Sequence, residues 1–348
     1  MQDSEYQKRD GGAETIDHRD DNKSQERAIE TGYLQPGMSL PLVVRPAASD
    51  VDLVLWSINN RQFIKAKLFE HGAILFRDFK VDSPDDFRRF VREVSGELIE
   101  YRERTSPRSE VGDRIYTATD YPADQGIFLH NENSYALTYP MKLFFFCDTP
   151  AEQGGETLIA DCRKIFQCIS PEIRDRFAQR KWMYVRNFGD GFGLDWQTVF
   201  QTADSIEVEQ YCRRAGVDCE WKDADRLRTR QVRPAVARHP QTGEMVWFNH
   251  ATFFHVSTLE PAMREILLDE FEEEDLPNNT FYGDGSRFEP SVLDEVRRAY
   301  LNEIVPVVWQ NGDIVMLDNM LVAHGRAPFI GARKILFAMT EPFTREDI

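Results

Sequence analysis

Two short motifs in the sequence place a histidine and a carboxylate two residues apart. They are His18-Arg19-Asp20 and His130-Asn131-Glu132. Alternate residues of a strand point to the same face, so this spacing sets an imidazole beside a carboxylate. Together with a second, distant histidine, such a pair holds iron on one side and leaves the opposite positions open to reactants. A chain of this composition contains about one such match by chance, so the context must decide between the two motifs.

The context favours the second motif. His18 lies in a polar stretch that offers no scaffold for a ligand, whereas His130 directly follows the apolar run 127–129 and precedes a stretch rich in Tyr and Phe. Taken by itself, the motif also allows His130 to be an ordinary structural histidine. What favours a metal site is the C-terminal segment, in which the distant histidine, His324, lies near the start of a predicted strand.

The same C-terminal segment supplies a cation. The turn Asn311-Gly312 opens an apolar strand, a second turn follows at Asp318-Asn319, and Arg333 begins a further strand after His324. An iron site that chelates a dicarboxylate needs a positive group for the distant carboxylate, and the planar guanidinium of an arginine suits that role.

Four segments resemble those of Fe(II)/2-oxoglutarate-dependent oxygenases of the taurine dioxygenase and clavaminate-synthase-like superfamily. They are His130-Asn131-Glu132-Asn133-Ser134-Tyr135, Gly154-Gly155-Glu156-Thr157, Trp247-Phe248-Asn249 and the block from Asp318 to Arg333. The resemblance covers residues 40 to 345. Within the superfamily, the segments 101–108, 227–234 and 282–285 are similar to hydroxylases associated with syringomycin-type nonribosomal peptide pathways.

The resemblance implies roles for individual residues. The implied metal triad consists of His130, Glu132 and His324. Thr157 falls where the Gly-Gly-x-Thr motif donates a hydroxyl to 2-oxoglutarate, and Arg333 matches the arginine that pairs with the distal carboxylate. Arg326 is a second candidate for that last role, because the gap from His324 to Arg333 is shorter than in many relatives. Glu132 replaces the commoner Asp, and a carboxylate there argues against a halogenase, which needs this position vacant for halide.

The implied fold is mixed α/β, with a double-stranded β-helix (jelly-roll) core flanked by helices. The implied enzyme is a dioxygenase that uses Fe(II), O2 and 2-oxoglutarate to hydroxylate an unactivated carbon of an amino acid. That amino acid would be free or tethered to an acidic carrier protein, in specialised metabolism. The same iron centre could instead desaturate or cyclise a small carboxylate. A zinc hydrolase and a non-catalytic jelly-roll binding module are further alternatives, although a zinc hydrolase gives no reason for the Thr157 motif or Arg333.

The candidate substrate residues are Arg230 and Asn249. Arg226, Arg228 and Arg230 alternate, so on a strand they share a face, either as an anion clamp or as surface ion pairs. Asn249 lies in an apolar and aromatic segment, and the superfamily places an Asn-containing strand beside the pocket.

Other polar residues are interpreted as structural. The cluster of Arg102, Arg104 and Arg108 is expected to make surface or loop ion pairs. His250 and His255 are expected to be satisfied residues of the core or its rim.

Hydrophobic periodicity predicts the elements that must position these residues. Helices are predicted over 50–70, 84–94, 170–181, 261–274 and 291–303. Strands are predicted over 73–77, 115–119, 127–129, 142–147, 231–237 and 245–249, and again between 305 and 339. The turn-rich stretch 239–243 predicts a hairpin. No repeat of 20–50 residues is found.

Charge and composition limit the partners and the compartment. The net charge of −17 argues against nucleic acid and anionic membranes, and no apolar run approaches the ~20 residues of a membrane span. Residues 1–35 predict a disordered acidic tail, and 36–348 predict a single domain. Five cysteines without a Cys-x-x-Cys pair, and no apolar leader, predict reduced thiols in the cytoplasm. A small-molecule substrate is expected, and nothing in the sequence predicts the oligomeric state.

Overall fold

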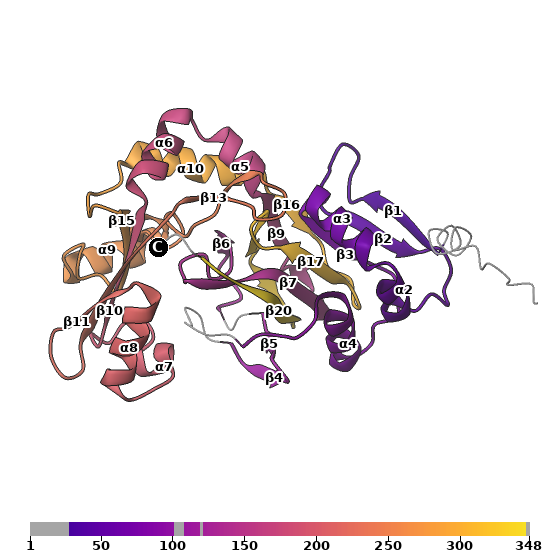
Figure 1. Ribbon diagram of the computed structural model, residues 1–348, viewed down its shortest axis with the longest axis horizontal. Coiled ribbons are helices and arrows are strands. Elements are labelled where there is room, and N and C mark those ends of the chain that lie inside the picture. The colour runs from indigo at the N-terminus through magenta and orange to yellow at the C-terminus, as the bar shows by residue number, and fades with distance from the viewer. Residues whose placement is uncertain (1–27, 101–107, 119–120, 346–348) are drawn as a thin grey trace, which may run out of the picture.

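The computed structural model describes residues 28–100, 108–118 and 121–345 (Figure 1). Among these residues, the largest sheet has eight strands, all paired antiparallel except for the parallel pair β2 and β3. In spatial order they are β1 (Ile29–Tyr33), β2 (Leu42–Pro46), β3 (Ala73–Phe76), β17 (Ile314–Asp318), β7 (Thr138–Thr149), β20 (Lys334–Thr344), β5 (Ile115–Thr117) and β4 (Glu110–Gly112).

A second, antiparallel sheet of four strands carries the histidines of the predicted metal site. Its order is β16 (Val305–Val307), β9 (Thr157–Asp161), β18 (Val322–Arg326) and β6 (Ile127–His130). A third sheet lies on the opposite side of the molecule from β1–β3 (Figure 1). Its order is β11 (Asp218–Trp221), β12 (Leu227–Arg233), β10 (Trp182–Phe188) and β15 (Asn278–Tyr282). Two short antiparallel pairs are β13 (Val236–Arg238) with β14 (Met245–Trp247), and β19 (Phe329–Ile330) with β8 (Gln153–Gly154).

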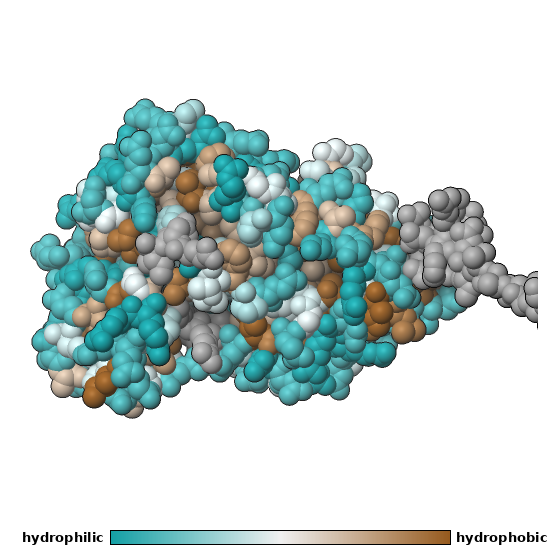
Figure 2. Space-filling model, viewed as in Figure 1, coloured by the Kyte–Doolittle hydropathy of each residue, from teal (hydrophilic) through white to brown (hydrophobic). Residues whose placement is uncertain are grey.

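The helices lie outside these sheets (Figure 1). They are α2 (Leu53–Asn59), α3 (Arg61–His71), α4 (Pro84–Ser95), α5 (Cys162–Cys168), α6 (Pro171–Arg180), α7 (Trp196–Phe200), α8 (Ser205–Ala215), α9 (Pro261–Glu270) and α10 (Pro290–Asn302), with the 3-10 turn η1 (Val256–Thr258). None of the helices in the described ranges is long and apolar enough to cross a bilayer. The face in Figure 2 is largely hydrophilic, and its apolar residues form separate spots.

The central strands bury both of their faces, because successive side chains point in opposite directions. In β7, Leu143 and Phe145 join the core cluster that also contains residues of the four-stranded sheet, such as Ile159. Phe144 and Phe146 point the other way, into the cluster under α2, α3 and α4. This explains why β7 contains the uninterrupted apolar run 143–147 rather than an alternation.

Most predicted elements are confirmed within a few residues, including α4, α6, α10, β3 and the hairpin of β13 and β14. The helix predicted over 50–70 is wrong in one respect, because it is two helices that meet at Asn60. Asn60 donates from its side chain to the carbonyl of Trp56 at 2.7 Å, which satisfies the end of α2 locally.

The predicted disordered tail is also too long. Residues 29–33 form β1, which pairs with β2 along its whole length although most of its side chains are exposed. The backbone ladder with Leu42–Pro46 supplies the order that the polar side chains cannot. Residues 1–27 lie outside the described residues, and the assignment of the remainder to a single domain stays a prediction.

Candidate metal centre

The two histidines of the predicted triad face each other across a strand pair. His130 ends β6, His324 lies in β18, and the two residues are directly opposite in the antiparallel register. Directly opposite residues of such a pair project to the same face. Their ring centroids lie 4.4 Å apart.

Glu132 completes the cluster from the loop that follows β6. Its Oε2 lies 3.8 Å from Nε2 of His324. One ligand atom from each of His130, Glu132 and His324 can be chosen so that all three lie within 4.8 Å of one another. The structure therefore brings together the three residues that the sequence predicts as metal ligands.

The protonation of the two imidazoles suits a metal. Nδ1 of His130 lies 2.9 Å from the carbonyl oxygen of Phe128, so it donates its proton there and leaves Nε2 with a lone pair. Burial lowers the pKa of His130, an effect that Glu132 partly opposes. Burial, with His130 and Arg108, also lowers the pKa of His324 well below its usual value. Both rings are therefore neutral at neutral pH, which is the form that binds metals.

The donor set fits a divalent transition metal. Two imidazoles and one carboxylate are the ligands of non-haem Fe(II) oxygenases. Nδ1 of His324 is buried and has no hydrogen-bond partner among the described residues, and His324 and Glu132 are 5% and 3% exposed. A buried nitrogen without a partner carries a desolvation cost, which only a metal bound to that same nitrogen would remove.

Arg108 is a member of the site that the sequence interpretation missed. It was expected to make surface or loop pairs, but its Nη2 donates to Oε2 of Glu132 at 2.8 Å, and the two side chains are 5% and 4% exposed. Its guanidinium also lies 4.2 Å from the ring centroid of Phe337, in β20. The signals for it in the sequence are the basic cluster and the resemblance of segment 101–108 to related hydroxylases. The other members of the cluster, Arg102 and Arg104, lie outside the described residues.

Aromatic side chains surround the triad. The rings of Phe253 and His250 lie 4.7 and 5.6 Å from that of His130, and the ring of Phe145 lies 5.2 Å from that of His324. His250 is buried, and its Nδ1 lies 2.5 Å from Oγ of Ser134, so it is a satisfied core residue, as expected. Such a wall keeps the dielectric low and limits access of water to the ligands.

Thr157 is placed on the same sheet face as His324. In the ladder of β9 and β18, Ile159 lies opposite His324, and Thr157 lies opposite Arg326, two residues farther along. Thr157 is buried, and its Oγ1 accepts a hydrogen bond from Nε1 of Trp309 at 3.1 Å. An indole nitrogen only donates, so the proton of the Thr157 hydroxyl is left for another acceptor.

The two glycines before Thr157 allow close contacts with the chain around Arg333. Gly154 and Gly155 both have positive φ, and a Cβ on Gly154 would lie 2.2 Å from the carbonyl oxygen of Pro328. A Cβ on Gly155 would lie 3.0 Å from Cδ and Nε of Arg333. Because Gly155 lacks that atom, Arg333 donates from Nε to its carbonyl at 3.0 Å.

Arg333 is the better of the two candidate cations. No carboxylate of the described residues forms an ion pair with it, and burial, with neighbouring Arg326, lowers its pKa to about 10, which still leaves it charged at neutral pH. Arg326 instead donates to three backbone carbonyls. They belong to Tyr121, Pro122 and Gln125.

The predicted substrate residues both have hydrogen-bond partners within the protein. Nη1 of Arg230 lies 2.8 Å from Oε2 of Glu220 on the neighbouring strand β11. Asn249 is buried, donates to the carbonyl of Ala235 at 2.7 Å and accepts from the N–H of Ala251 at 2.9 Å. Their roles in substrate binding stay predictions.

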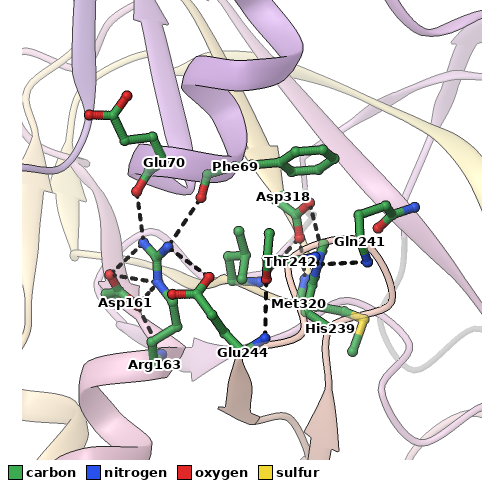
Figure 3. A network of polar contacts seen from close by, with 11 residues as sticks. Phe69, Glu70, Asp161, Arg163, His239, Gln241, Thr242, Glu244, Asp318 and Met320 are labelled. Carbon is green, nitrogen blue, oxygen red and sulfur yellow. Dashed lines mark hydrogen bonds and ion pairs between the residues drawn. The ribbon is translucent and has the colours of Figure 1, made fainter.

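Buried charges anchor the chain just before His324. Asp318, at the end of β17, accepts a hydrogen bond from Nζ of Lys142 at 2.6 Å. It also lies 3.2 Å from Nε2 of His239 (Figure 3). Its other oxygen accepts from the N–H groups of Met320 and Leu321. Burial alone would raise the pKa of Asp318, but Lys142 and His239 hold it well below its usual range.

A neighbouring network fixes the hairpin that carries His239. Arg163 lies 2.8 Å from Asp161 and 3.3 Å from Glu244 (Figure 3). It also donates to the carbonyl oxygens of Phe69 and Glu70, which lie in the last turn of α3. One arginine thus ties together β9, the hairpin and the helix that precedes β3.

Known proteins resemble this chain in sequence. It is 37% identical to the dapdiamide synthesis protein DdaC of Enterobacter agglomerans over 302 residues, which cover 87% of this chain and 92% of that protein. It is 28% identical to a clavaminate synthase-like protein of Arabidopsis thaliana over 317 residues, which cover 86% and 93% of the two chains.

Solved structures share the fold. PvcB of Pseudomonas aeruginosa matches with a TM-score of 0.55 at 15% identity, covering 90% of this chain and 91% of that one. AAD-2, solved with Mn(II) and N-oxalylglycine, matches with a TM-score of 0.53 at 12% identity, covering 92% and 99%. At these identities the likeness concerns the fold.

The family follows from the sequence match. Residues 38–340 match the family described as taurine catabolism dioxygenase TauD, TfdA family. This confirms the expected dioxygenase with Fe(II) and 2-oxoglutarate as its cofactor and cosubstrate, and the His-Glu-His cluster can hold the metal. The chain belongs to the TauD/TfdA family of dioxygenases.

Proposed function

We propose that this dioxygenase hydroxylates an unactivated carbon of an amino-acid-like small molecule in a biosynthetic pathway, with His130, Glu132 and His324 as its metal ligands. The observation that carries the proposal is the meeting of these three residues, from separate segments, in a buried cluster within 4.8 Å. The eight-stranded and four-stranded sheets, which share one core cluster, are then the two sheets of a jelly roll.

The protein residues position the reactants. Fe(II), when bound with 2-oxoglutarate and O2, supplies the oxidant that removes hydrogen from an unactivated carbon. Thr157 would donate a hydrogen bond from its hydroxyl to 2-oxoglutarate, since Trp309 already donates to the same hydroxyl oxygen. Arg333 pairs with the distal carboxylate. The aromatic side chains around His130 and His324 exclude water from the reaction.

The proposed substrate is a free small molecule rather than one tethered to a carrier protein. An acidic carrier would need exposed, unpaired cations near the pocket. Instead, Arg228 and Arg233 are buried, Arg230 pairs with Glu220, and Arg326 donates to backbone carbonyls. The dapdiamide synthesis protein, by its name, also works in a biosynthetic pathway, which supports a substrate from specialised metabolism.

Anaerobic reconstitution tests the proposal. Adding Fe(II) and 2-oxoglutarate to the protein should produce a weak visible charge-transfer band at about 500 nm. Admitting oxygen should then lead to conversion of 2-oxoglutarate to succinate. Glu132→Ala should abolish both signals in a folded protein. Absence of the band and of oxygen-dependent succinate in well-folded wild-type protein would contradict the proposal, and metal-dependent turnover without oxygen would favour a zinc hydrolase instead.

The type of oxidation is tested with substrate. A screen of free amino acids and of carrier-bound aminoacyl groups should find turnover with the free compounds. The product should gain one oxygen atom. Loss of two hydrogens without a gain of oxygen would assign desaturation or cyclisation, and turnover only on the carrier would overturn the choice of a free substrate.

A further inference from the structure

Glu132 is the one proposed ligand that no strand holds. β6 ends at His130, and the pairing of β6 with β18 is already irregular beside it. Glu132 therefore lies beyond the ladder that fixes His130 opposite His324. A glutamate also has one more rotatable bond than the commoner aspartate, so its carboxylate has more freedom, which contacts around the residue must restrict.

Asn319 holds that backbone from both sides. Its Oδ1 accepts from the N–H of Glu132 at 2.8 Å, and its Nδ2 donates to the carbonyl of Glu132 at 2.9 Å. The same Nδ2 donates to the carbonyl of Pro140 at 2.8 Å, and Asn319 is fully buried. The side-chain amide thus takes the place of the strand partner that Glu132 lacks.

Asn131 makes the reverse connection. It lies between the first two proposed ligands, is fully buried, and donates from Nδ2 to the carbonyl of Asn319 at 2.7 Å and of Val322 at 3.2 Å. The segment that carries His130 and Glu132 therefore donates hydrogen bonds to the segment that leads to His324. The side chain of Asn319, in that second segment, hydrogen-bonds back to Glu132.

Further contacts fix the position of Asn319. Asn319 follows Asp318, which contacts with Lys142 and His239 hold in the core. Only an amide of this length can both accept from one N–H and donate to two carbonyls. An aspartate would turn a charged acceptor toward the carbonyl oxygens of Glu132 and Pro140, and a glutamine would be one methylene too long.

We propose that Asn131 and Asn319 are positioning residues, a reciprocal clasp that sets the separation between Glu132 and His324 and thereby the affinity for the metal. The inference rests on the proposed metal triad. Groups that orient metal ligands typically contribute about 10- to 100-fold to affinity. Loss of either amide should therefore weaken metal binding while the fold persists.

Mn(II) binding to the purified protein, followed by the electron paramagnetic resonance of the free ion, tests the clasp. Asn319→Ala should raise the Kd for Mn(II) about 10- to 100-fold, and Asn131→Ser, which removes the amide but keeps a small polar group, should also raise it. Activity lost at low Fe(II) should return at high Fe(II), a rescue that general loss of structure would not allow. If Asn319→Ala does not fold, Asn131→Ser tests the same proposal.

Asn187→Ala is the matched control. Asn187 is also a buried asparagine, donates to the carbonyls of Glu274 and Leu276 at 3.0 and 2.8 Å, and accepts from Arg228, but it lies in β10 of the third sheet. Its variant should lose comparable stability and keep the Mn(II) affinity of the wild type. An unchanged Kd in folded Asn319→Ala or Asn131→Ser overturns the clasp alone, whereas an unchanged Kd in Glu132→Ala overturns the triad as well.

Discussion

Arg108 donates from Nη2 to Oε2 of Glu132 across 2.8 Å, and both side chains are almost completely buried. The guanidinium of Arg108 also lies over the ring of Phe337 in β20, 4.2 Å from its centroid. The carboxylate proposed to bind the metal therefore has a cationic neighbour within the protein, supplied by a segment that precedes all three proposed ligands.

This pair predicts that Arg108→Met destabilises the protein mainly when metal is absent. Removing one partner of a buried ion pair typically costs about 3–5 kcal/mol, because the other charge is left without a counter-ion. A bound divalent ion gives Glu132 a new one. Thermal unfolding in chelator and in saturating Mn(II) should show a larger stabilisation by metal in the variant than in the wild type.

Arg108→Lys serves as the control, since it keeps the charge but loses the planar group over Phe337. Its response to metal should lie between those of the wild type and the methionine variant. An equal fall in Tm with and without metal would show that Arg108 acts on the fold and not on the carboxylate.

Trp309 should influence the binding of 2-oxoglutarate without touching it. Its indole N–H donates to Oγ1 of Thr157, which directs the hydroxyl proton elsewhere. Trp309→Phe removes one neutral hydrogen bond, worth about 1 kcal/mol, so KM for 2-oxoglutarate should rise roughly 3- to 10-fold with little change in kcat. Steady-state kinetics at saturating substrate measure both values, and a fall in kcat at constant KM would contradict this role.

The sequence predicts the elements that are periodic and local. The apolar run of β7, the capped helix α4 and the hairpin of β13 and β14 are confirmed because neighbouring residues determine them. β10 was not predicted, because its order comes from pairing with β12 and β15, which lie far away in the sequence. β1 was missed for the same reason, since only its backbone pairing with β2 orders it.

The residues of the candidate site likewise fall into those that the sequence predicts and those that only the structure reveals. Motif spacing and the family resemblance point to His130, Glu132 and His324, which the structure brings together. Arg108 reaches Glu132 only through tertiary folding, so a sequence pattern cannot separate it from a surface arginine. Asn319 is likewise inconspicuous as a turn residue, and its three bonds to Glu132 and Pro140 are visible only in three dimensions.

Arg333 and Arg326 should respond differently to substitution. Arg333 forms no ion pair within the described ranges, so Arg333→Met should leave folding intact and raise KM for 2-oxoglutarate about 10- to 100-fold, the range for a hydrogen bond to a charged group. Arg326→Met leaves the carbonyls of Tyr121, Pro122 and Gln125 without their donor. It should therefore lower Tm, with a smaller effect on KM for 2-oxoglutarate than that of Arg333→Met. Paired measurements of KM and Tm decide between them, and the reverse pattern would assign the carboxylate to Arg326.

His255 should make the protein less stable in mild acid. Burial, reinforced by Arg297, lowers the pKa of His255 to about 4, whereas the unfolded chain binds a proton at about pH 6.5. Between these values the unfolded state holds more protons than the folded state, so the free energy of unfolding falls as the pH falls from about 6.5 to about 4. The slope from this residue is about 1.4 kcal/mol per pH unit, and it vanishes below the folded pKa.

The variant His255→Gln isolates this contribution from those of the other buried histidines. It keeps a group that can accept from the N–H of Ser257, as Nδ1 of His255 does at 3.1 Å, but it does not titrate. Urea unfolding at pH 7.5 and pH 5 should therefore show a smaller loss of stability in acid for the variant than for the wild type. Equal losses would mean that the imidazole is protonated in the folded protein, and that its packing near Phe288 tolerates the charge.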